Sequence, residues 1–137
     1  MAGFLLDTCV LSETRKRNPD AGVVQFLAEA DAAQLYISVL TIGEMHKGIA
    51  KKRLTDAAAA DRIAAWTWRI ETDFVDRILA LDAATARLWG ELSASGRAPA
   101  IDTLIAATGM VHGLTVVTRN VKDFLASGAA LLNPWRG

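Results

Sequence analysis

The sequence is poor in the residues that build disulfides and histidine metal sites. It has one cysteine, Cys9, and two histidines in 137 residues. A lone cysteine excludes an intramolecular disulfide and a zinc site made of cysteines, and it suits a reducing compartment. No apolar run approaches the roughly 20 residues of a membrane span, and the first residues reach Asp7 without the basic region of a signal peptide. We therefore expect a cytoplasmic protein that makes no membrane contact and binds any metal through oxygen.

An excess of charge of one sign is absent as well. Lysine and arginine number 15, and aspartate and glutamate also number 15, so the net charge gives no general attraction to nucleic acid. Nucleic-acid binding therefore has to come from local patches, such as Arg15-Lys16-Arg17 and the lysine-rich run 47–53. Such runs are mostly solvent-exposed faces, and the alternative is a positive surface for a nucleic-acid backbone. The sequence leaves both interpretations open.

Strand-like apolar runs alternate with segments of helical periodicity. The predicted strands are 4–11, 35–40, 78–81 and 114–118, with a weaker one at 130–132. Asp82 predicts the N-cap of a helix over 83–95, and Gly113 the C-cap of the helix before the 114–118 strand. The alternation favours an α/β fold with a central parallel sheet flanked by helices. Because the chain has three prolines and no linker-like segment, we expect residues 1–137 to form one domain.

Four carboxylates lie where strand-like runs give way to helices, or just inside a helix. They are Asp7, Glu44, Asp102 and Asp123. The carboxyl ends of parallel strands meet at one edge of an α/β sheet, where these proteins build ligand sites. Four gathered negative charges need a cation, and carboxylate oxygens suit divalent metals. The sequence therefore predicts a divalent-metal site made by these four residues.

Each acid also has a structural explanation. Thr41-Ile42-Gly43-Glu44 matches a helix capping box, and residues 120–123 resemble a weaker one. Asp102 lies near a predicted helix start, where the helix dipole favours a negative charge, and Asp7 would cap the turn after the first strand. For one acid taken alone, the structural role is the commoner one. It does not explain why acids follow the most buried strands, where Ser or Asn would cap at a lower electrostatic cost.

The remaining chemically active side chains are weaker candidates. His46 lies two residues after Glu44 and so faces about 160° away on the same helix. His112 is placed at a helix C-terminus, where an imidazolium interacts well with the dipole. Cys9 has no base in its motif and is interpreted as a small buried residue. We assign none of the three to catalysis.

Five segments together resemble the PIN-domain proteins, and closely the ribonuclease toxins of VapBC toxin–antitoxin modules, in particular their FitB-like branch. The segments are Leu5-Leu6-Asp7-Thr8, Leu40-Thr41-Ile42-Gly43-Glu44, Ile101-Asp102-Thr103-Leu104-Ile105-Ala106-Ala107-Thr108, Val117-Thr118-Arg119-Asn120 and Asn133-Pro134-Trp135. None is specific alone, but together they span nearly the whole chain.

The resemblance implies a Rossmann-like sheet and an endoribonuclease site that uses Mg²⁺ or Mn²⁺. The catalytic and metal-binding residues would be Asp7, Glu44, Asp102 and Asp123. Many relatives carry an acid at the position of Asn120, so the fourth acidic role falls to Asp123 or in part to the Asn120 amide. Thr118 and Asn120 are expected to orient the acids. The resemblance also implies a homodimer and a cognate VapB-type antitoxin that occludes the site in a heterotetramer or larger complex, with DNA bound only through the antitoxin.

The expected reaction is hydrolysis of an RNA phosphodiester by an activated water. Mg²⁺ prefers octahedral oxygen coordination and keeps several waters, so we expect Asp7 and Asp102 to ligate it directly. Glu44 and Asp123 would then act through water or on a second ion. Single-stranded RNA or a loop is the expected substrate, because its backbone can be splayed into the site. The alternative is a non-catalytic PIN fold that serves as a binding module in a DNA-bound toxin–antitoxin complex.

Overall fold

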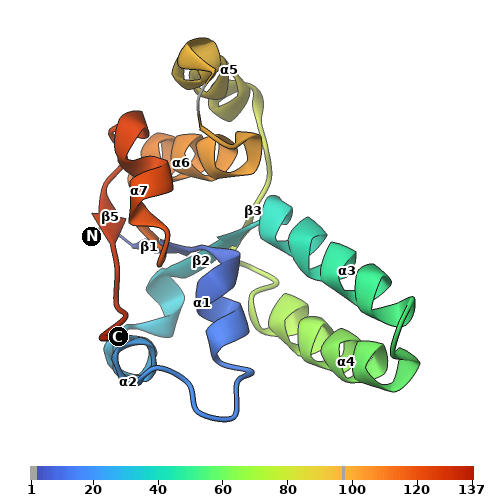
Figure 1. Cartoon of the computed structure of the whole chain (residues 1–137). Coiled ribbons are helices and arrows are strands. Elements are labelled where there is room, and N and C mark those ends of the chain that lie inside the picture. The colour runs from blue at the N-terminus through green and yellow to red at the C-terminus, as the bar shows by residue number, and fades with distance from the viewer. Residues whose placement is uncertain (1–2, 97) are drawn as a thin grey trace.

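The computed structural model describes residues 3–96 and 98–137, and within them a five-stranded parallel sheet forms the centre of the molecule (Figure 1). The strands are β1 Phe4–Leu6, β2 Leu35–Ser38, β3 Ile78–Leu79, β4 Thr115–Val117 and β5 Leu131–Leu132. Their spatial order is β3-β2-β1-β4-β5. Phe4 pairs with Leu35 on one side and Thr115 on the other, so β1 is the middle strand. The strand order reverses between β1 and β4, which makes this point the topological switch point of the sheet.

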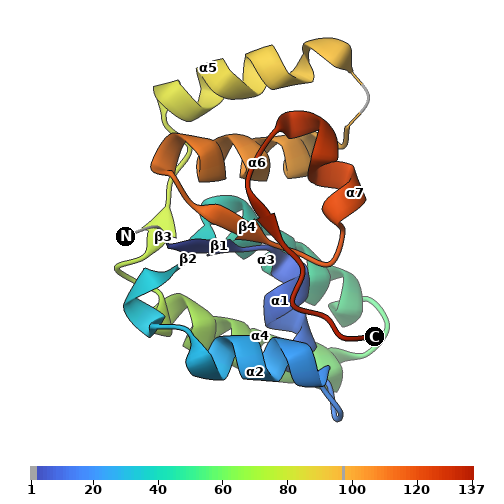
Figure 2. The ribbon, with the colours of Figure 1, turned by 90° about the vertical axis from the view of Figure 1, so that its left-hand side faces the viewer.

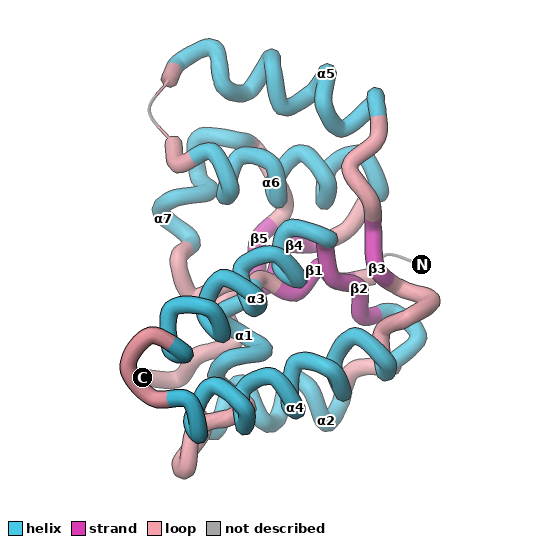
Figure 3. Tube along the Cα trace, turned by 90° about the vertical axis from the view of Figure 1, so that its right-hand side faces the viewer, coloured by secondary structure: helices cyan, strands magenta, loops and turns pink. Residues whose placement is uncertain are grey.

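Helices cover both faces of the sheet. They are α1 Thr8–Glu13, α2 Ala21–Glu29, α3 Val39–Arg53, α4 Ala57–Asp73, α5 Ala83–Leu92, α6 Ala100–His112 and α7 Val121–Phe124. Figure 2 shows α6 between the sheet and α5, with α2 and α4 on the opposite side. The helices α3 and α4 lie side by side and extend away from the strands (Figures 1 and 3). Among the described residues, no helix combines the length and apolarity needed to span a membrane.

The strands are apolar on both faces because each face is covered. Leu6 and Val117 belong to a core cluster that includes residues of α1, α2 and α3, whereas Leu5 and Val116 pack with Ile105 of α6 on the other face. Neighbouring residues of a strand point to opposite faces, so each strand contributes to both clusters. Parallel strands covered on both sides appear in a sequence as continuous apolar runs, which is the pattern found here. The predicted fold class, an α/β domain with a central parallel sheet, is confirmed.

The strands are shorter than their apolar runs suggested. The run 4–11 is wrong as one strand, because β1 ends at Leu6 and Thr8 begins α1. The run 35–40 likewise includes the first two residues of α3, and the run 78–81 is a strand only to Leu79. The first turn of a buried helix is as apolar as a buried strand, and a run of this length does not separate the two. Runs 114–118 and 130–132 shorten to 115–117 and 131–132.

Two predicted helix ends are confirmed. The Asp82 carboxylate accepts a hydrogen bond from the Thr85 amide at the start of α5. This helix ends at Leu92 and is followed by a 3₁₀ turn over Ser93–Ser95. Gly113 ends α6 with a φ of 66°, a left-handed conformation that favours glycine.

One glycine brings α6 close to the sheet. A Cβ atom at Gly109 would lie 2.9 Å from Val116 Cγ2 of β4, so only a residue without a side chain allows this approach. The close packing fixes the height of α6 above β4. It thereby positions the N-terminal turn of α6, which carries Asp102.

Candidate active site

Asp7 lies at the switch point, held by several hydrogen bonds. Its amide donates to the Val117 carbonyl at 3.0 Å, which continues the pairing of β1 with β4. Its Oδ1 accepts from the Thr8 amide at 2.9 Å and caps α1, and its Oδ2 accepts from the Thr118 hydroxyl at 2.9 Å. Thr118 in turn accepts from the Asn120 amide at 3.0 Å. The α1 cap therefore uses one carboxylate oxygen of Asp7, and Thr118 holds the other.

Glu44 lies within α3 and not at its start. Ser38 is the N-cap of this helix and accepts from the Leu40 amide at 3.0 Å, so Glu44 is the sixth residue of a helix that begins at Val39. The capping-box interpretation of Thr41 and Glu44 is wrong for this reason. Glu44 instead accepts a 2.6 Å hydrogen bond from the Thr8 hydroxyl. No helix-capping role thus explains this acid.

Asp102 is the acid in the first turn of α6. Pro99 is the N-cap residue and makes no side-chain capping bond. Burial, followed by the negative charges of Asp7, Asp123 and Glu44, raises the pKa of Asp102 to about 6. The three charges act on Asp102 only if all four carboxylates lie within electrostatic reach. Asp102 in α6 thus lies within electrostatic reach of the other three acids that the sequence singled out, namely Asp7 directly after β1, Glu44 in α3 and Asp123 in α7.

Asp123 and Asn120 lie at the outer side of the group. Asp123 is the third residue of the short helix α7 and is exposed, yet it lines a small cavity together with Asp102. Asn120 is the N-cap residue of α7 but makes no side-chain capping bond, and the link to Asp123 is a backbone hydrogen bond of 3.0 Å. The weaker capping box predicted over 120–123 is therefore wrong. Neither residue has a capping contact that would account for its side chain.

The donor set fits a hard divalent cation. The four acids offer carboxylate oxygens, and their mutual repulsion is relieved by a positive charge between them. Within the described residues, no three histidine, cysteine, aspartate or glutamate side chains are close enough to ligate one ion together. Mg²⁺ is usually held by one or two carboxylates and keeps several waters, so an open arrangement of acids suits it. The predicted division into direct and water-mediated ligands stays a prediction.

Thr8 is a site residue to which sequence reasoning gave no role. Its hydroxyl joins α1 to Glu44, and it also lies 3.3 Å from the hydroxyl of Thr41, which is fully buried. A hydroxyl residue directly after the first acid was the available signal. Its partner on α3 lies 36 residues away, and such a contact is set by tertiary packing.

None of the other candidates, His46, His112 and Cys9, is placed to act as a general base beside the acids. His46 is exposed and pairs with Glu71 of α4 at 3.0 Å, and His112 is exposed at the end of α6. Cys9 Sγ lies 3.7 Å from Asp7 Oδ2 and 3.7 Å from Thr118 Oγ1. Burial above all raises the pKa of the Cys9 thiol, so it is neutral at pH 7. The interpretation of Cys9 as a small packing residue is consistent with this.

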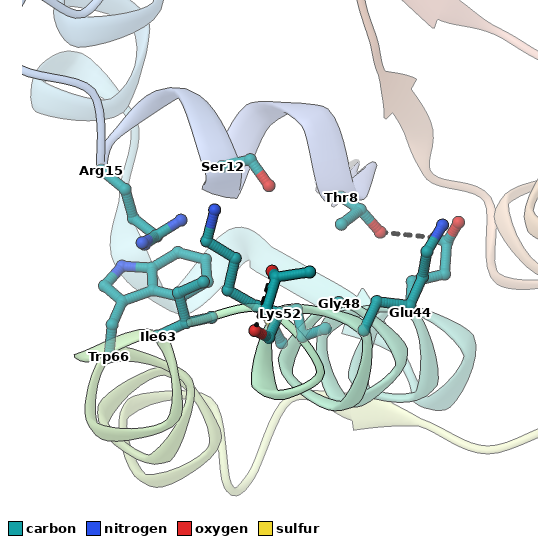
Figure 4. A pocket seen from close by; sticks show the side chains of 11 residues that line it. Thr8, Ser12, Arg15, Glu44, Gly48, Lys52, Ile63 and Trp66 are labelled. Carbon is teal, nitrogen blue, oxygen red and sulfur yellow. Dashed lines mark hydrogen bonds between the residues drawn. The ribbon is translucent and has the colours of Figure 1, made fainter. Parts of the chain in front are cut away.

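Two grooves begin at Glu44. One of about 410 Å³ lies between α1, α3 and α4, with Thr8 and Glu44 among its lining residues (Figure 4). The other, of about 480 Å³, follows the side of α3 that faces Ile101. Lys51 lines both grooves. Part of the basic sequence runs thus lies next to the acidic group.

Comparison with known proteins now assigns the family. The PIN-domain family profile matches residues 4–126 of the chain. The chain belongs to the PIN-domain family. This PIN domain is 31% identical to the VapC ribonuclease Y4jK of Sinorhizobium fredii, over 96% of the chain and 97% of that protein. It is also 31% identical to the Toxin FitB of Neisseria gonorrhoeae, over 96% of the chain and 98% of that protein.

Solved structures agree with this assignment. The crystal structure of FitAcB from Neisseria gonorrhoeae matches this PIN domain with a TM-score of 0.87 and 31% sequence identity, covering 98% of the chain and 99% of that chain. The resemblance to FitB-like PIN-domain toxins stated from the sequence is therefore confirmed. The roles of the individual acids are not tested by these likenesses.

Proposed function

We propose that this PIN domain is the toxin of a type II toxin–antitoxin pair and acts as an endoribonuclease that depends on Mg²⁺ or Mn²⁺. Its proposed catalytic and metal-binding residues are Asp7, Glu44, Asp102 and Asp123. The observation that carries the proposal is the placement of the acids at the switch point of the sheet: Thr118 fixes Asp7, Thr8 joins Glu44 to α1, and Asp102 and Asp123 line one cavity. Burial and the charges of the other three acids together raise the pKa of Asp102. Such crowding is costly unless a cation joins the group. The likeness to a VapC ribonuclease over nearly the full length supports RNA as the substrate.

The chain's own residues hold the acids in place. Asp7 receives hydrogen bonds from the Thr8 amide and the Thr118 hydroxyl, and Glu44 receives one from the Thr8 hydroxyl. Carboxylates fixed in this way do not have to be ordered when a cation and a phosphate arrive, which lowers the entropic cost of assembling the site. When bound, the divalent cation supplies a water of lowered pKa and neutralises charge on the phosphate. Asn120, which follows Thr118 by two residues, would help to orient the acids.

Partner binding is proposed from the same relatives. The full-length likeness to Toxin FitB supports a cognate antitoxin of the VapB type that covers the acids. We propose a cytoplasmic homodimer that forms a heterotetramer or larger complex with it, and DNA contact only through the antitoxin. An arrangement of this kind keeps the nuclease inactive until the antitoxin is removed.

Controlled expression in a bacterial host tests this function. Wild-type protein is expected to arrest growth, and the nearly isosteric Asp7→Asn variant is expected to permit it, since Asn still caps α1 but lacks the charge. Co-expression of a small open reading frame adjacent to the gene is expected to restore growth. If Asp7→Asn arrests growth as strongly as the wild type, the arrest does not depend on the Asp7 carboxylate, and the proposed metal-dependent site is contradicted.

A further inference from the structure

We propose that the groove between α1, α3 and α4 holds single-stranded RNA next to the scissile phosphate, with one nucleobase stacked on Trp66. This inference rests on the proposed function and adds the path that the bound RNA strand follows beyond the four acids. We call this surface the Trp66 groove. Its lining residues include Thr8, Arg15, Glu44, Lys51, Lys52 and Trp66.

The Trp66 groove starts at the catalytic acids. Thr8 and Glu44, which share a 2.6 Å hydrogen bond, form one end of it. Figure 4 shows Arg15 and Trp66 at the other end, with Lys52 on α3 between the two ends. An RNA strand whose phosphate lies at the acids has to continue over a neighbouring surface. The Trp66 groove, with a volume of about 410 Å³, provides such a surface and begins at Glu44.

The charges in the groove match a phosphate backbone. Arg15, Lys51 and Lys52 line it, and within the described residues Glu44 is its one acidic lining residue. None of the three cations forms an ion pair with a carboxylate of the described chain. They are exposed and available to phosphates. A polyanion is therefore attracted beyond the acids, although the protein has no net charge.

Trp66 provides the apolar surface that a base requires. It is half-buried, and the guanidinium of the exposed Arg15 lies over its ring, 5.2 Å from the centroid, so this side chain has to leave the ring face when a base stacks there. Aromatic rings beside a positive groove are how single-stranded nucleic acids are commonly held, because every base stacks whatever its sequence. Once displaced from the ring, the Arg15 guanidinium stays next to the stacked nucleotide and can pair with its phosphate. Trp68 on the same helix is 70% exposed and does not line the groove, so it offers an internal comparison.

RNA binding by the full-length protein tests the aromatic part. Binding of a fluorescent single-stranded RNA of about 12 nucleotides would be measured in the Asp102→Asn background, which keeps the RNA intact. We expect Trp66→Leu to weaken binding about tenfold, Trp66→Phe to retain most of it and Trp68→Leu to leave it unchanged. Thermal unfolding of each variant shows whether the fold is kept. If Trp66→Leu unfolds, the quenching of tryptophan fluorescence by bound RNA decides, because stacking on Trp66 predicts that the quenching is lost in Trp66→Phe and kept in Trp68→Phe.

The salt dependence of binding tests the basic part. For a single strand, every phosphate that the protein no longer neutralises reduces the slope of log affinity against log salt by about 0.7. We expect the double variant Lys51→Gln/Lys52→Gln to lower the slope by about 1.4. The control Arg69→Gln/Arg87→Gln removes the same charge from exposed positions outside the groove and is expected to leave the slope unchanged.

Cleavage separates this inference from the proposed function. With the four acids intact, the groove variants are expected to slow cleavage of the longer RNA much more than that of a trinucleotide, whereas Trp68→Leu is expected to cleave both like wild type. If the wild type cleaves no RNA, the proposed function is contradicted, but the binding measurements still test whether RNA occupies the groove. RNA binding equal to wild type in both groove variants overturns the inference. The inference is also overturned if the groove variants weaken binding of the antitoxin but not of RNA, because the groove is then a protein-docking surface.

Discussion

The Thr118 hydroxyl donates a 2.9 Å hydrogen bond to Asp7 Oδ2, although the two residues are 111 positions apart in the chain. The bond joins the ends of β1 and β4 at the switch point of the sheet. The same hydroxyl accepts from the Asn120 amide and so connects α7 to the acids. Removing a group that hydrogen-bonds a metal-binding side chain typically lowers metal affinity or activity by about 10–100-fold.

Replacing Thr118 tests this link. In Thr118→Val, the fully buried hydroxyl becomes a methyl group of similar size, and the Asp7 oxygen and the Asn120 amide no longer have this partner. We expect the free energy of unfolding to fall by about 1–3 kcal/mol and RNA cleavage by about 10–100-fold. Urea denaturation and a cleavage assay measure the two effects. Thr118→Ser keeps the hydroxyl and is expected to retain most activity; equal loss in Ser and Val would show that only packing matters.

The raised pKa of Asp102 predicts how stability depends on pH in the metal-free protein. The folded state binds a proton at this carboxyl up to about pH 6, whereas the unfolded state releases it near pH 4. Folding is therefore opposed by this group at pH 7, and its unfavourable contribution disappears as the pH falls from 7 to 4. We expect wild type to gain stability relative to Asp102→Asn over this interval.

The same reasoning sets the outcome of the Asp102→Asn substitution at neutral pH. Removing one of four crowded charges is expected to raise the Tm of the metal-free protein at pH 7.5 by about 3 °C, after allowance for solvent screening. Added Mg²⁺ is expected to raise the Tm of wild type but not that of the variant. Calorimetry with and without EDTA measures both. A lower Tm for the variant in EDTA would contradict the crowding that we describe.

The Thr8–Glu44 hydrogen bond predicts a pair of related phenotypes. Thr8→Val removes the donor but leaves the Glu44 charge, and it is expected to lower cleavage about tenfold. Glu44→Gln keeps an acceptor for Thr8 but removes the charge, and it is expected to lower cleavage further. Because Glu44 does not cap α3, Tm should change little. Glu91→Gln on the exposed face of α5 is the matched control, and activity in Glu44→Gln equal to that control would exclude Glu44 from the site.

Asp123 and Asn120 compete for the fourth acidic role. If Asp123 contributes, Asp123→Asn is expected to weaken cleavage more at low Mg²⁺ than at high Mg²⁺, because removal of a ligand lowers metal affinity first. Adding Asn120→Asp is then expected to restore part of the activity at low Mg²⁺. Rates over a Mg²⁺ titration for both single variants and the double variant measure this. An Asp123→Asn titration identical to wild type would leave Asp7, Glu44 and Asp102 as the site.

The sequence predicts this fold well because its local signals and its tertiary structure agree. The apolar runs place the strands, and Asp82 and Gly113 mark helix ends with the capping geometry they suggest. Element boundaries are less predictable, since Val39 and Leu40 look like strand residues but begin α3. Ser38, a good capping residue in its own right, precedes them and starts the helix earlier than Thr41 would.

The site is predictable in its acids and not in the groups around them. Asp7 and Asp102 stand out because a carboxylate next to a buried apolar segment is costly. The partners Thr8 and Thr118 carry no such signal, because a hydroxyl near an acid is common and its hydrogen bond depends on distant packing. The Trp66 groove is likewise absent from any local pattern, since α1, α3 and α4 form it together.

Cleavage of one single-stranded RNA by wild type and by Asp102→Asn, from EDTA through a Mg²⁺ titration, tests the central claim most directly. We expect wild type to be inactive in EDTA and active with Mg²⁺ or Mn²⁺. Asp102→Asn is expected to be at least about 100-fold slower at every concentration, a larger loss than removal of a residue that only orients a ligand. Cleavage by wild type that is unchanged in EDTA, or full activity in a folded Asp102→Asn variant, would contradict a metal-dependent nuclease site made by these four acids.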